Sequence, residues 1–270
     1  MSERDRVFDS SIPDIYNSYM VPLLFEPYAV DLAARIAEFS PETVLETAAG
    51  TGVVTRALAP LLGSSARYWV TDLNQPMLDC AAKLQGDDRR IVWRQADASK
   101  LPFDDGAFDI VCCQFGAMFF PDKIAGYAEA RRVLKPSGRF VFNVWDHLDA
   151  NEFSKVIADS VAAAFPDNPP QFIARTPHGY HDTDLIRAQL AEAGFSKVSI
   201  DTIEKQSHAP TARYVAIALC QGTPFRNEIT TRDASRLEAV TDQAATAIAE
   251  RFGQGAIAAK MQAHIVVAAS

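Results

Sequence analysis

Residues 43–55 read TVLETAAGTGVVT, a short apolar strand followed by a turn of small residues and then by the start of a helical pattern. The turn holds Ala48, Ala49, Gly50 and Gly52, and none of these residues carries a bulky substituent on Cβ. A backbone that passes close to a ligand needs such residues. Turns of this kind, between a strand and a helix, are where α/β sheets bind nucleotides. The stretch therefore predicts a nucleotide-like ligand on an α/β fold.

Strand-like and helix-like segments alternate from residue 43 to about residue 145, with short connections between them. The predicted strands are residues 44–47, 68–71, 91–94, 108–113 and 139–144. The predicted helices are residues 53–62, 75–84 and 122–134. Repeated βα units with apolar strands indicate a parallel sheet with helices on both faces. With two more strands at residues 197–203 and 265–268, we expect a Rossmann-like, seven-stranded, mostly parallel α/β sheet.

Segments outside this alternation are expected to form a helical lid. The boundaries of these segments follow from three features of the sequence. They are helical periodicity at residues 28–39 and 183–193, a proline cluster near residue 170 and an Ala-rich stretch after residue 208. The predicted organisation is an N-terminal helical lid segment (1–42), a ligand-binding core (43–146), a lid insertion (147–181), the core continued (182–207), a helical insertion (208–258) and the last core strand (259–270).

Composition narrows the classes of partner. The chain has 26 Lys+Arg against 34 Asp+Glu, a formal charge of −8, which argues against nucleic acid as the main partner. The four cysteines show no metal-binding spacing, so we expect reduced core thiols and no metal. The N-terminus is charged, and no window approaches the ~18 apolar residues of a membrane span. These features favour a cytoplasmic protein with a small-molecule partner and no membrane contact; a homodimer is left open.

Three acidic residues follow three successive predicted strands. Glu46 ends the first strand, Asp72 ends the second, twenty residues after Gly52, and Asp97 follows the third. A carboxylate at the second position can accept hydrogen bonds from both hydroxyls of a ribose. A nicotinamide-dependent dehydrogenase would need GxGxxG, but the chain reads GTGVVT from residue 50, with Thr55 at the third glycine position. An adenosine-type ligand of another class is therefore favoured over the dehydrogenase.

Four motifs resemble those of class I S-adenosylmethionine-dependent methyltransferases, close to the ubiquinone/menaquinone-type and small-molecule group. They are VLETAAGTG (44–52), VTDLNQPML (70–78), QADASKLPFDDGAFDIVCCQFGAMFFPD (95–122) and RRVLKPSGRFVFNVWD (131–146). They cover about the middle third of the chain, in family order and spacing. The chain departs from the family in having Ala48 where glycine is frequent and Ser137 within the usual Lys-Pro-Gly-Gly.

The resemblance implies S-adenosyl-L-methionine as the cofactor and assigns roles to individual residues. Glu46 would lie beside the methionine ammonium, Asp72 would hold the ribose hydroxyls, and Asp97 with Ala98 would recognise the adenine edge. Leu73 and Met77 are expected either to pack on the adenine or to belong to the core. Gln114 and Phe115 would line the pocket near the sulfonium, although Gln114 could instead cap its strand. The full predicted set is Glu46, Ala48, Gly50, Thr51, Asp72, Leu73, Met77, Asp97, Ala98, Gln114, Phe115, Tyr16 and Tyr19.

The predicted reaction is transfer of a methyl group to an O, N or C atom of a small organic acceptor. Such a displacement depends on alignment and on exclusion of water, so a dedicated base is optional. His178 and His181, in TPHGYHD after the proline cluster, are the candidate bases, with a surface or capping role as the alternative. Tyr16 and Tyr19 could close over the cofactor or only pack the lid. A non-catalytic, cofactor-binding regulatory protein is the alternative function.

Overall fold

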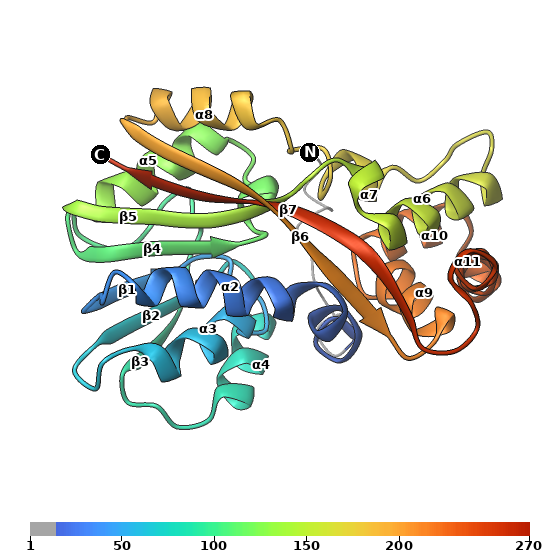
Figure 1. The fold of residues 1–270 in the computed structure, drawn as a ribbon, viewed down its shortest axis with the longest axis horizontal. Coiled ribbons are helices and arrows are strands. Elements are labelled where there is room, and N and C mark those ends of the chain that lie inside the picture. The colour runs from blue at the N-terminus through green and yellow to red at the C-terminus, as the bar shows by residue number, and fades with distance from the viewer. Residues whose placement is uncertain (1–14) are drawn as a thin grey trace. The chain divides into compact units, whose positions relative to one another are not determined.

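Residues 15–270 are described by the computed structural model, and they form two compact units (Figure 1). The first, called the sheet unit, comprises Glu26–Trp145, His181–Ile203 and Ala263–Ser270. The second, called the helical unit, comprises residues 15–25, Asp146–Tyr180 and Glu204–Gln262. Strands β6 and β7 contribute residues to both units.

A seven-stranded sheet with the order β3-β2-β1-β4-β5-β7-β6 organises the sheet unit, as the sequence predicted. The strands are β1 Thr43–Glu46, β2 Arg67–Asp72, β3 Ile91–Gln95, β4 Phe108–Gln114, β5 Leu134–Trp145, β6 Lys197–Ala209 and β7 Ile257–Ala269. The first five strands pair in parallel, whereas β7 pairs with β5 in the antiparallel sense. Because β1, β2, β3 and β4 are parallel, their carboxyl ends meet at one edge of the sheet.

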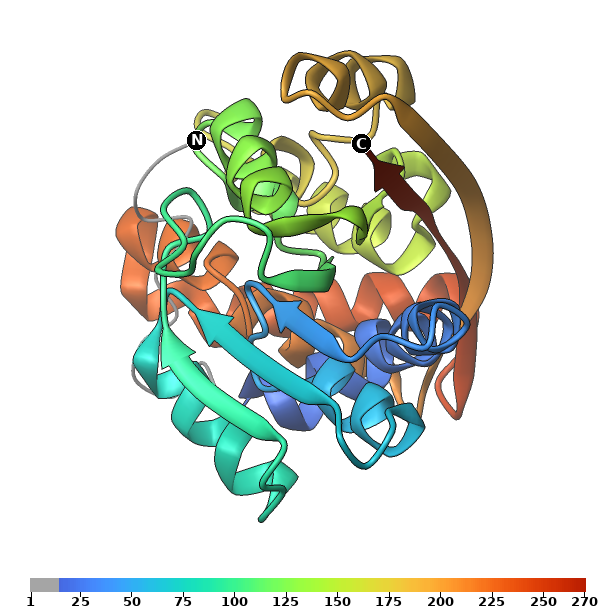
Figure 2. The same cartoon turned by 90° about the vertical axis from the view of Figure 1, so that its left-hand side faces the viewer.

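Helices cover both faces of the sheet, as predicted (Figure 2). They are α2 Glu26–Ala37, α3 Val53–Leu58 with the 3₁₀ turn η3 Ala59–Leu61, α4 Gln75–Gln85, α5 Lys123–Val133 and α8 Thr183–Glu192, with the 3₁₀ turn η4 Ala117–Phe119 after β4. Helix α2 packs against α3, and α3 against α4, on one face, while α5 packs against α8 on the other. Between sheet and α5, the rings of Tyr127, Phe140 and Phe142 form a buried aromatic cluster.

Capping residues account for the predicted limits of α8. The Asp182 carboxylate accepts hydrogen bonds from the backbone N–H groups of Asp184 and Leu185 and is therefore the N-cap of the helix. Gly194 follows the helix with φ +95°, a left-handed conformation that glycine adopts at low cost and that ends the helix.

The helical unit contains η2 Tyr16–Phe25, wound as a π-helix, then η5 Leu148–Ala150, α6 Glu152–Ala164, α7 Phe172–Arg175, α9 Ala212–Gln221, α10 Phe225–Asp233, η6 Ala234–Arg236 and α11 Leu237–Phe252. Helix α9 packs against η2, α6, α10 and α11. The predicted boundaries differ in two respects. Helix α2 belongs to the sheet unit although it precedes residue 42, and β6 and β7 are longer than predicted, reaching Ala209 and starting at Ile257.

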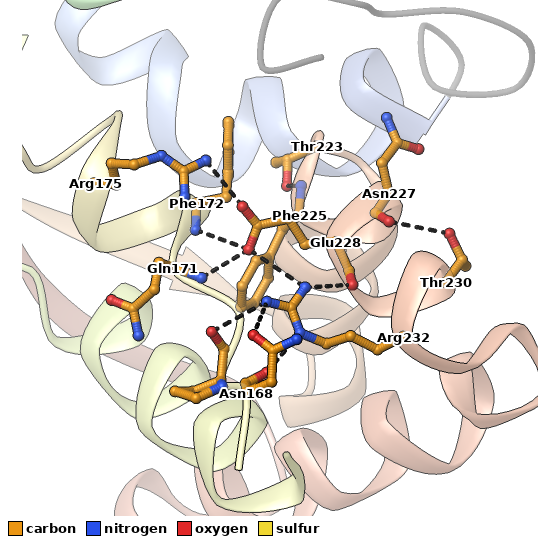
Figure 3. A network of polar contacts seen from close by, with 11 residues as sticks. Asn168, Gln171, Phe172, Arg175, Thr223, Phe225, Asn227, Glu228, Thr230 and Arg232 are labelled. Atoms are coloured by element: carbon orange, nitrogen blue, oxygen red, sulfur yellow. Dashed lines mark hydrogen bonds and ion pairs between the residues drawn. The ribbon is translucent and has the colours of Figure 1, made fainter. Parts of the chain in front are cut away.

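Glu228 of α10 holds the segment before α7 by several hydrogen bonds (Figure 3). Its carboxylate accepts from the backbone N–H of Gln171 at 2.7 Å and of Phe172 at 3.3 Å, and from the Arg175 guanidinium at 2.9 Å. Arg232, one turn along α10, donates to the carbonyls of Asn168 and Glu228. These contacts connect the proline-rich connection to α10.

Replacing Glu228 with alanine is expected to lower the free energy of unfolding by about 2 kcal/mol, because the N–H groups of Gln171 and Phe172 at the start of α7 and the Arg175 guanidinium would lose a charged acceptor. Glu238 is the matched control, since it also pairs with an arginine, Arg213 at 2.9 Å, but its side chain is 68% exposed against 19% for Glu228. Its alanine variant is expected to change stability by less than about 0.5 kcal/mol. Urea denaturation measures both, and equal losses would refute the structural role of Glu228.

The four cysteines are thiols and form no disulfide: Cys112, Cys113 and Cys220 are buried and Cys80 is partly exposed. Burial raises the pKa of the Cys113 and Cys220 thiols to about 12. Within residues 15–270, no three His, Cys, Asp or Glu side chains gather as metal ligands. No helix in that range is both long and apolar enough to cross a membrane.

Candidate cofactor site

The turn after β1 has the tight backbone that its small residues predict. Ala48, Gly50 and Gly52 all have positive φ, at +52°, +56° and +78°. A Cβ on Gly52 would lie 3.0 Å from the Cβ of Ala81 on α4, so this residue also allows close packing of the turn on that helix. The alternating left-handed residues turn the chain sharply from the end of β1 into α3, and backbone N–H groups in such turns are suited to bind a polar ligand.

Asp72, at the end of β2, is bound to this turn. Its Oδ2 accepts a hydrogen bond from the backbone N–H of Gly50 at 2.8 Å, and its Oδ1 accepts from the backbone N–H of Asn74 at 2.8 Å. The carboxyl group is buried, and burial raises its pKa. Oδ1 also accepts from Asn74 Nδ2 at 3.3 Å. Asp72 can therefore accept one hydroxyl donor at Oδ2 directly and a second at Oδ1 where that hydroxyl replaces the long bond from Asn74 Nδ2.

Glu46, at the end of β1, is a buried carboxyl group held by two hydroxyl donors. Its Oε2 accepts from Tyr68 Oη at 2.5 Å and from Thr55 Oγ1 at 2.7 Å. Burial raises the pKa of Glu46 to about 7, and the nearby positive charge of Arg56 opposes this rise. Because both bonds are made by one oxygen, the second oxygen, Oε1, can still accept from a ligand.

Thr51 gives an independent sign of a ligand at the turn. Its side chain is buried, and its Oγ1 has no hydrogen-bond partner among the described residues. Arg56 holds the carbonyl of the same residue, with Nη1 donating at 2.6 Å. An unpaired buried hydroxyl costs about 1–3 kcal/mol. A polar ligand at the turn would remove this cost, so the residues present fit a polar cofactor.

The third strand end lies next to the second. The Ala96 N–H donates to the Asp72 carbonyl at 3.0 Å, which places the following residues, Asp97 and Ala98, beside the end of β2. The Asp97 side chain is exposed and accepts from the Ser99 N–H at 2.8 Å. Of the two apolar candidates, Leu73 is 39% exposed beside Asp72 and remains able to contact a ligand.

Met77, by contrast, is buried in α4, which supports the alternative that it belongs to the core.

Gln114 and Phe115 lie where β4 ends, next to the turn after β1. The following residue, Gly116, has room for no side chain, because a Cβ there would lie 2.5 Å from the Cβ of Ala48. The two strand-end turns are therefore in direct contact. Gln114 Oε1 accepts from Asn143 Nδ2 at 3.4 Å.

Both lid candidates, Tyr16 and Tyr19, lie in the helical unit. Tyr16 stacks on Phe25 and Tyr19 packs on Tyr214, contacts within the helical unit that support a packing role; closure over the cofactor stays a prediction.

Of the two candidate bases, His178 is buried in the helical unit, with Nδ1 at 2.9 Å from the Asp146 carbonyl, a contact that orients the ring. His181 belongs to the sheet unit and is partly exposed.

Three site residues escaped the sequence analysis: Thr55 and Tyr68, which hold Glu46, and Asn143, which contacts Gln114. In the sequence, Thr55 indicated only that the dinucleotide-binding motif GxGxxG is incomplete. The signal that could have identified all three residues is a hydroxyl or amide within an apolar segment, because buried polar groups need hydrogen-bond partners.

Replacing Ala48 with glycine is expected to raise the free energy of unfolding by about 1 kcal/mol, because Ala48 has φ +52° and glycine avoids the strain of this conformation. Ala49→Gly is the control, since the backbone of Ala49 does not have a positive φ. Its glycine variant is expected to lose about 0.5–1 kcal/mol. Thermal unfolding measures both changes, and a loss of stability in both variants would contradict the strain at Ala48.

Comparison with known proteins identifies the family of the chain. A family model described as a methyltransferase domain matches residues 45–142. The ubiquinone/menaquinone biosynthesis C-methyltransferase UbiE of Chromobacterium violaceum is 33% identical over 166 residues, which cover 58% of this chain and 68% of that protein.

Solved structures show the same fold. BH2331 of Bacillus halodurans has a TM-score of 0.57 at 21% identity, covering 88% of this chain and 97% of that one. The Haemonchus contortus phosphoethanolamine N-methyltransferase 2, solved with phosphomonomethylethanolamine and S-adenosylhomocysteine, has a TM-score of 0.55 at 14% identity, covering 97% of this chain and 60% of that one. The chain therefore belongs to the class I S-adenosylmethionine-dependent methyltransferases, in the group of the ubiquinone/menaquinone-type enzymes.

Proposed function

We propose that this methyltransferase binds S-adenosylmethionine across the ends of β1, β2, β3 and β4 and methylates a small organic acceptor. The proposal rests on the hydrogen bond between the ends of β1 and β2. The Asp72 carboxylate at the end of β2 accepts from the Gly50 N–H at 2.8 Å, in the turn that follows Glu46 at the end of β1. The residues proposed to hold the cofactor are Glu46, Ala48, Gly50, Thr51, Asp72, Leu73, Asp97, Ala98, Gln114 and Phe115.

The roles follow from the chemistry of each group. Asp72 accepts the two ribose hydroxyls, and Glu46 lies beside the cationic methionine ammonium, where Oε1 accepts a hydrogen bond. The Thr51 hydroxyl, which is buried and has no hydrogen-bond partner within residues 15–270, bonds a polar group of the same ligand. Asp97 and Ala98 recognise the adenine edge, and the exposed Leu73 packs on its face.

When bound, S-adenosylmethionine supplies an electrophilic methyl group on a sulfonium. The protein contributes by aligning the acceptor with that methyl group and by excluding water, which in well-oriented systems lowers a barrier by about 7–11 kcal/mol. A base is needed only where the acceptor must lose a proton. His178 and His181 are the two candidate bases, and a His178 Nδ1 that donates to the Asp146 carbonyl at 2.9 Å would leave Nε2 as its basic nitrogen.

The acceptor class is proposed from the relatives. The Chromobacterium violaceum protein is named for C-methylation in ubiquinone/menaquinone biosynthesis. A hydroquinone-type ring is accordingly the first acceptor to test, ahead of O- and N-nucleophiles. The family match ends at residue 142, before the Asp146–Tyr180 and Glu204–Gln262 segments of the helical unit. We therefore place the acceptor specificity of this enzyme in those segments.

To test the proposal, the purified full chain is incubated with S-adenosylmethionine that carries a deuterated methyl group and with one candidate acceptor at a time. The panel comprises a reduced demethylated quinone, a catechol, a primary amine and a carboxylic acid. Mass spectrometry is expected to find the labelled methyl group in one acceptor class, the quinol ring first, and NMR then locates the methylated atom. The same reactions with Asp72→Ala provide the control.

Methylation of an amine or acid but not of the quinol would refute the quinol assignment and leave the small-molecule assignment standing. Binding of S-adenosylhomocysteine without methylation of any acceptor, in a panel extended to phenols and thiols, would favour the non-catalytic regulatory alternative.

A further inference from the structure

Asn143 is a polar residue in the middle of a buried strand. It interrupts the apolar run FVFNVW at residues 140–145 in β5, and its side chain is 0% exposed. Burying an amide without partners costs more than burying an apolar side chain of the same size, so such a residue is expected to be fully hydrogen-bonded. The partners of Asn143 therefore indicate what the residue does.

Its partners are the last residue of β4 and the residue that follows. Asn143 Oδ1 accepts from the Phe115 backbone N–H at 2.9 Å, and the Asn143 carbonyl accepts from the same N–H at 3.2 Å. Asn143 Nδ2 also donates to Gln114 Oε1 at 3.4 Å. One side chain thus binds both residues at the turn after β4.

Phe115 is the strained residue of this turn. Its φ is +50°, a left-handed conformation that is rare for an aromatic residue and costs on the order of 1–3 kcal/mol. The conformation is held at the ring as well as at the backbone. The Phe115 ring stacks on Trp145 with centroids 3.9 Å apart and planes 9° apart, and Tyr28 packs edge-on against both rings at 5.5 Å.

Asn143 and Trp145 are two residues apart in β5 and so lie on the same face of the strand. One binds the Phe115 backbone and the other binds its ring. Strain that is held from two sides in this way is characteristic of functional sites, where the surrounding structure determines an otherwise unfavourable conformation.

The turn so held packs on the turn after β1. Gly116 approaches Ala48 so closely that a Cβ at residue 116 would lie 2.5 Å from the Ala48 Cβ and 2.7 Å from Cys113 Sγ. Real Cβ atoms do not approach other atoms so closely, and a shift of the turn after β4 would therefore displace Ala48. Ala48 lies between Glu46 and Gly50, which are proposed to contact the methionine end of the cofactor.

We propose that Asn143 is a positioning residue of the cofactor site: it holds Phe115 in its left-handed conformation and thereby sets the position of the turn at Ala48. The inference rests on the proposed location of the cofactor. Asn143 itself need not touch the cofactor, because its hydrogen bonds go to Gln114 and Phe115.

The test measures the Kd of S-adenosylhomocysteine by isothermal titration calorimetry for the full chain and its variants, together with thermal unfolding. Asn143→Leu, which keeps the size but removes both side-chain hydrogen bonds, is expected to weaken binding about tenfold or more. Asn143→Asp keeps the acceptor for the Phe115 N–H and is expected to bind within about threefold of the wild type. If the leucine variant does not fold, Asn143→Ala replaces it with the same expectation.

Asn151→Leu is the matched control. Asn151 is also a buried asparagine, and it accepts from the Gln262 N–H at 3.0 Å and donates to the Asp146 carbonyl at 3.2 Å within the helical unit. Its variant is expected to lose stability without a change in Kd. If Asn143→Leu behaves like this control, or if the leucine and aspartate variants bind equally, the positioning role is refuted. Absence of binding by the wild type would instead refute the proposed cofactor site.

Discussion

Replacing Asp72 with alanine is expected to weaken binding of S-adenosylhomocysteine by about 100- to 1000-fold. The proposed role of the Asp72 carboxylate is to accept two ribose hydroxyls, and a hydrogen bond to a charged group contributes about 1.5–3 kcal/mol. The same carboxylate binds the Gly50 and Asn74 N–H groups at 2.8 Å, so its removal also loosens the turn that contacts the methionine end. Isothermal titration calorimetry measures the change.

Asp79 is the control for the Asp72 prediction. It is exposed on the neighbouring helix α4 and accepts from Gln75 Nε2 at 2.8 Å. Asp79→Ala is expected to leave the Kd within about twofold of the wild-type value. Asp72→Asn, which keeps the shape and loses the charge, should lie between the two. An Asp72→Ala variant that is folded by thermal unfolding and binds as tightly as the wild type would contradict the proposed ribose site.

Raising the pH from acidic values towards 7 is expected to strengthen cofactor binding and to reduce the stability of the free protein, and both effects arise from Glu46. Burial raises the pKa of this carboxyl group from 4.5 to about 7. The groups that face it are the Tyr68 and Thr55 hydroxyls, the Arg56 guanidinium, the Asp72 carboxylate and the Cys112 and Cys113 thiols. Of these, only the arginine favours the ionised carboxylate by its charge.

The effect on stability follows from proton linkage. The folded protein binds a proton at Glu46 more tightly than the unfolded chain does, so this stabilisation is fully present below pH 4.5 and is lost as the pH rises to about 7. The loss corresponds to about 3 kcal/mol in the free energy of unfolding. Urea denaturation at several pH values measures this loss, and Glu46→Gln is expected to remove it.

The effect on binding has the opposite direction. A bound ammonium favours the ionised carboxylate, so cofactor binding below pH 7 must release a proton from Glu46. The affinity for S-adenosylhomocysteine is expected to rise roughly tenfold between about pH 5.5 and 7.5. Calorimetry at about pH 6.5 in buffers of different ionisation enthalpy counts the released protons.

Glu46→Gln should lose both the pH dependence and the proton release, whereas Glu42→Gln should keep them, because Glu42 is exposed and lies just before β1. A wild-type affinity that does not change over this pH range would contradict the placement of Glu46 beside the ammonium.

The sheet unit was largely predictable from the sequence, because its central strands are short apolar runs between clear turns. The end of β6 and the start of β7 were not. In β7, residues 257–263 alternate buried side chains with exposed or half-buried ones, and the polar Lys260 and the buried His264 obscure this pattern in the sequence. Helix α2 was predicted correctly as a helix but was assigned to the lid. Its buried face includes Tyr28 and Leu32, and the contacts of those residues with the sheet depend on the folded structure.

The strand-end residues of the site were also predictable, since Glu46, Asp72 and the turn between them follow a strand-turn-helix pattern that is local in sequence. The residues that position them are distant: Tyr68 is 22 residues from Glu46, and Asn143 is 28 residues from Phe115. Their roles depend on which strands are neighbours in the sheet, and β1 pairs with β2 and β4 pairs with β5. A hydroxyl or amide in an apolar run indicates a buried partner but does not identify it.

A crystal structure of the full chain with S-adenosylhomocysteine would show whether the turn at residues 46–52 and Asp72 bind the cofactor. We expect the ribose hydroxyls within hydrogen-bond distance of the Asp72 carboxylate, the ammonium beside Glu46 and the adenine beside Leu73 and Asp97. A bound adenosine that contacts none of these residues, or no bound ligand at saturating concentration, would contradict it.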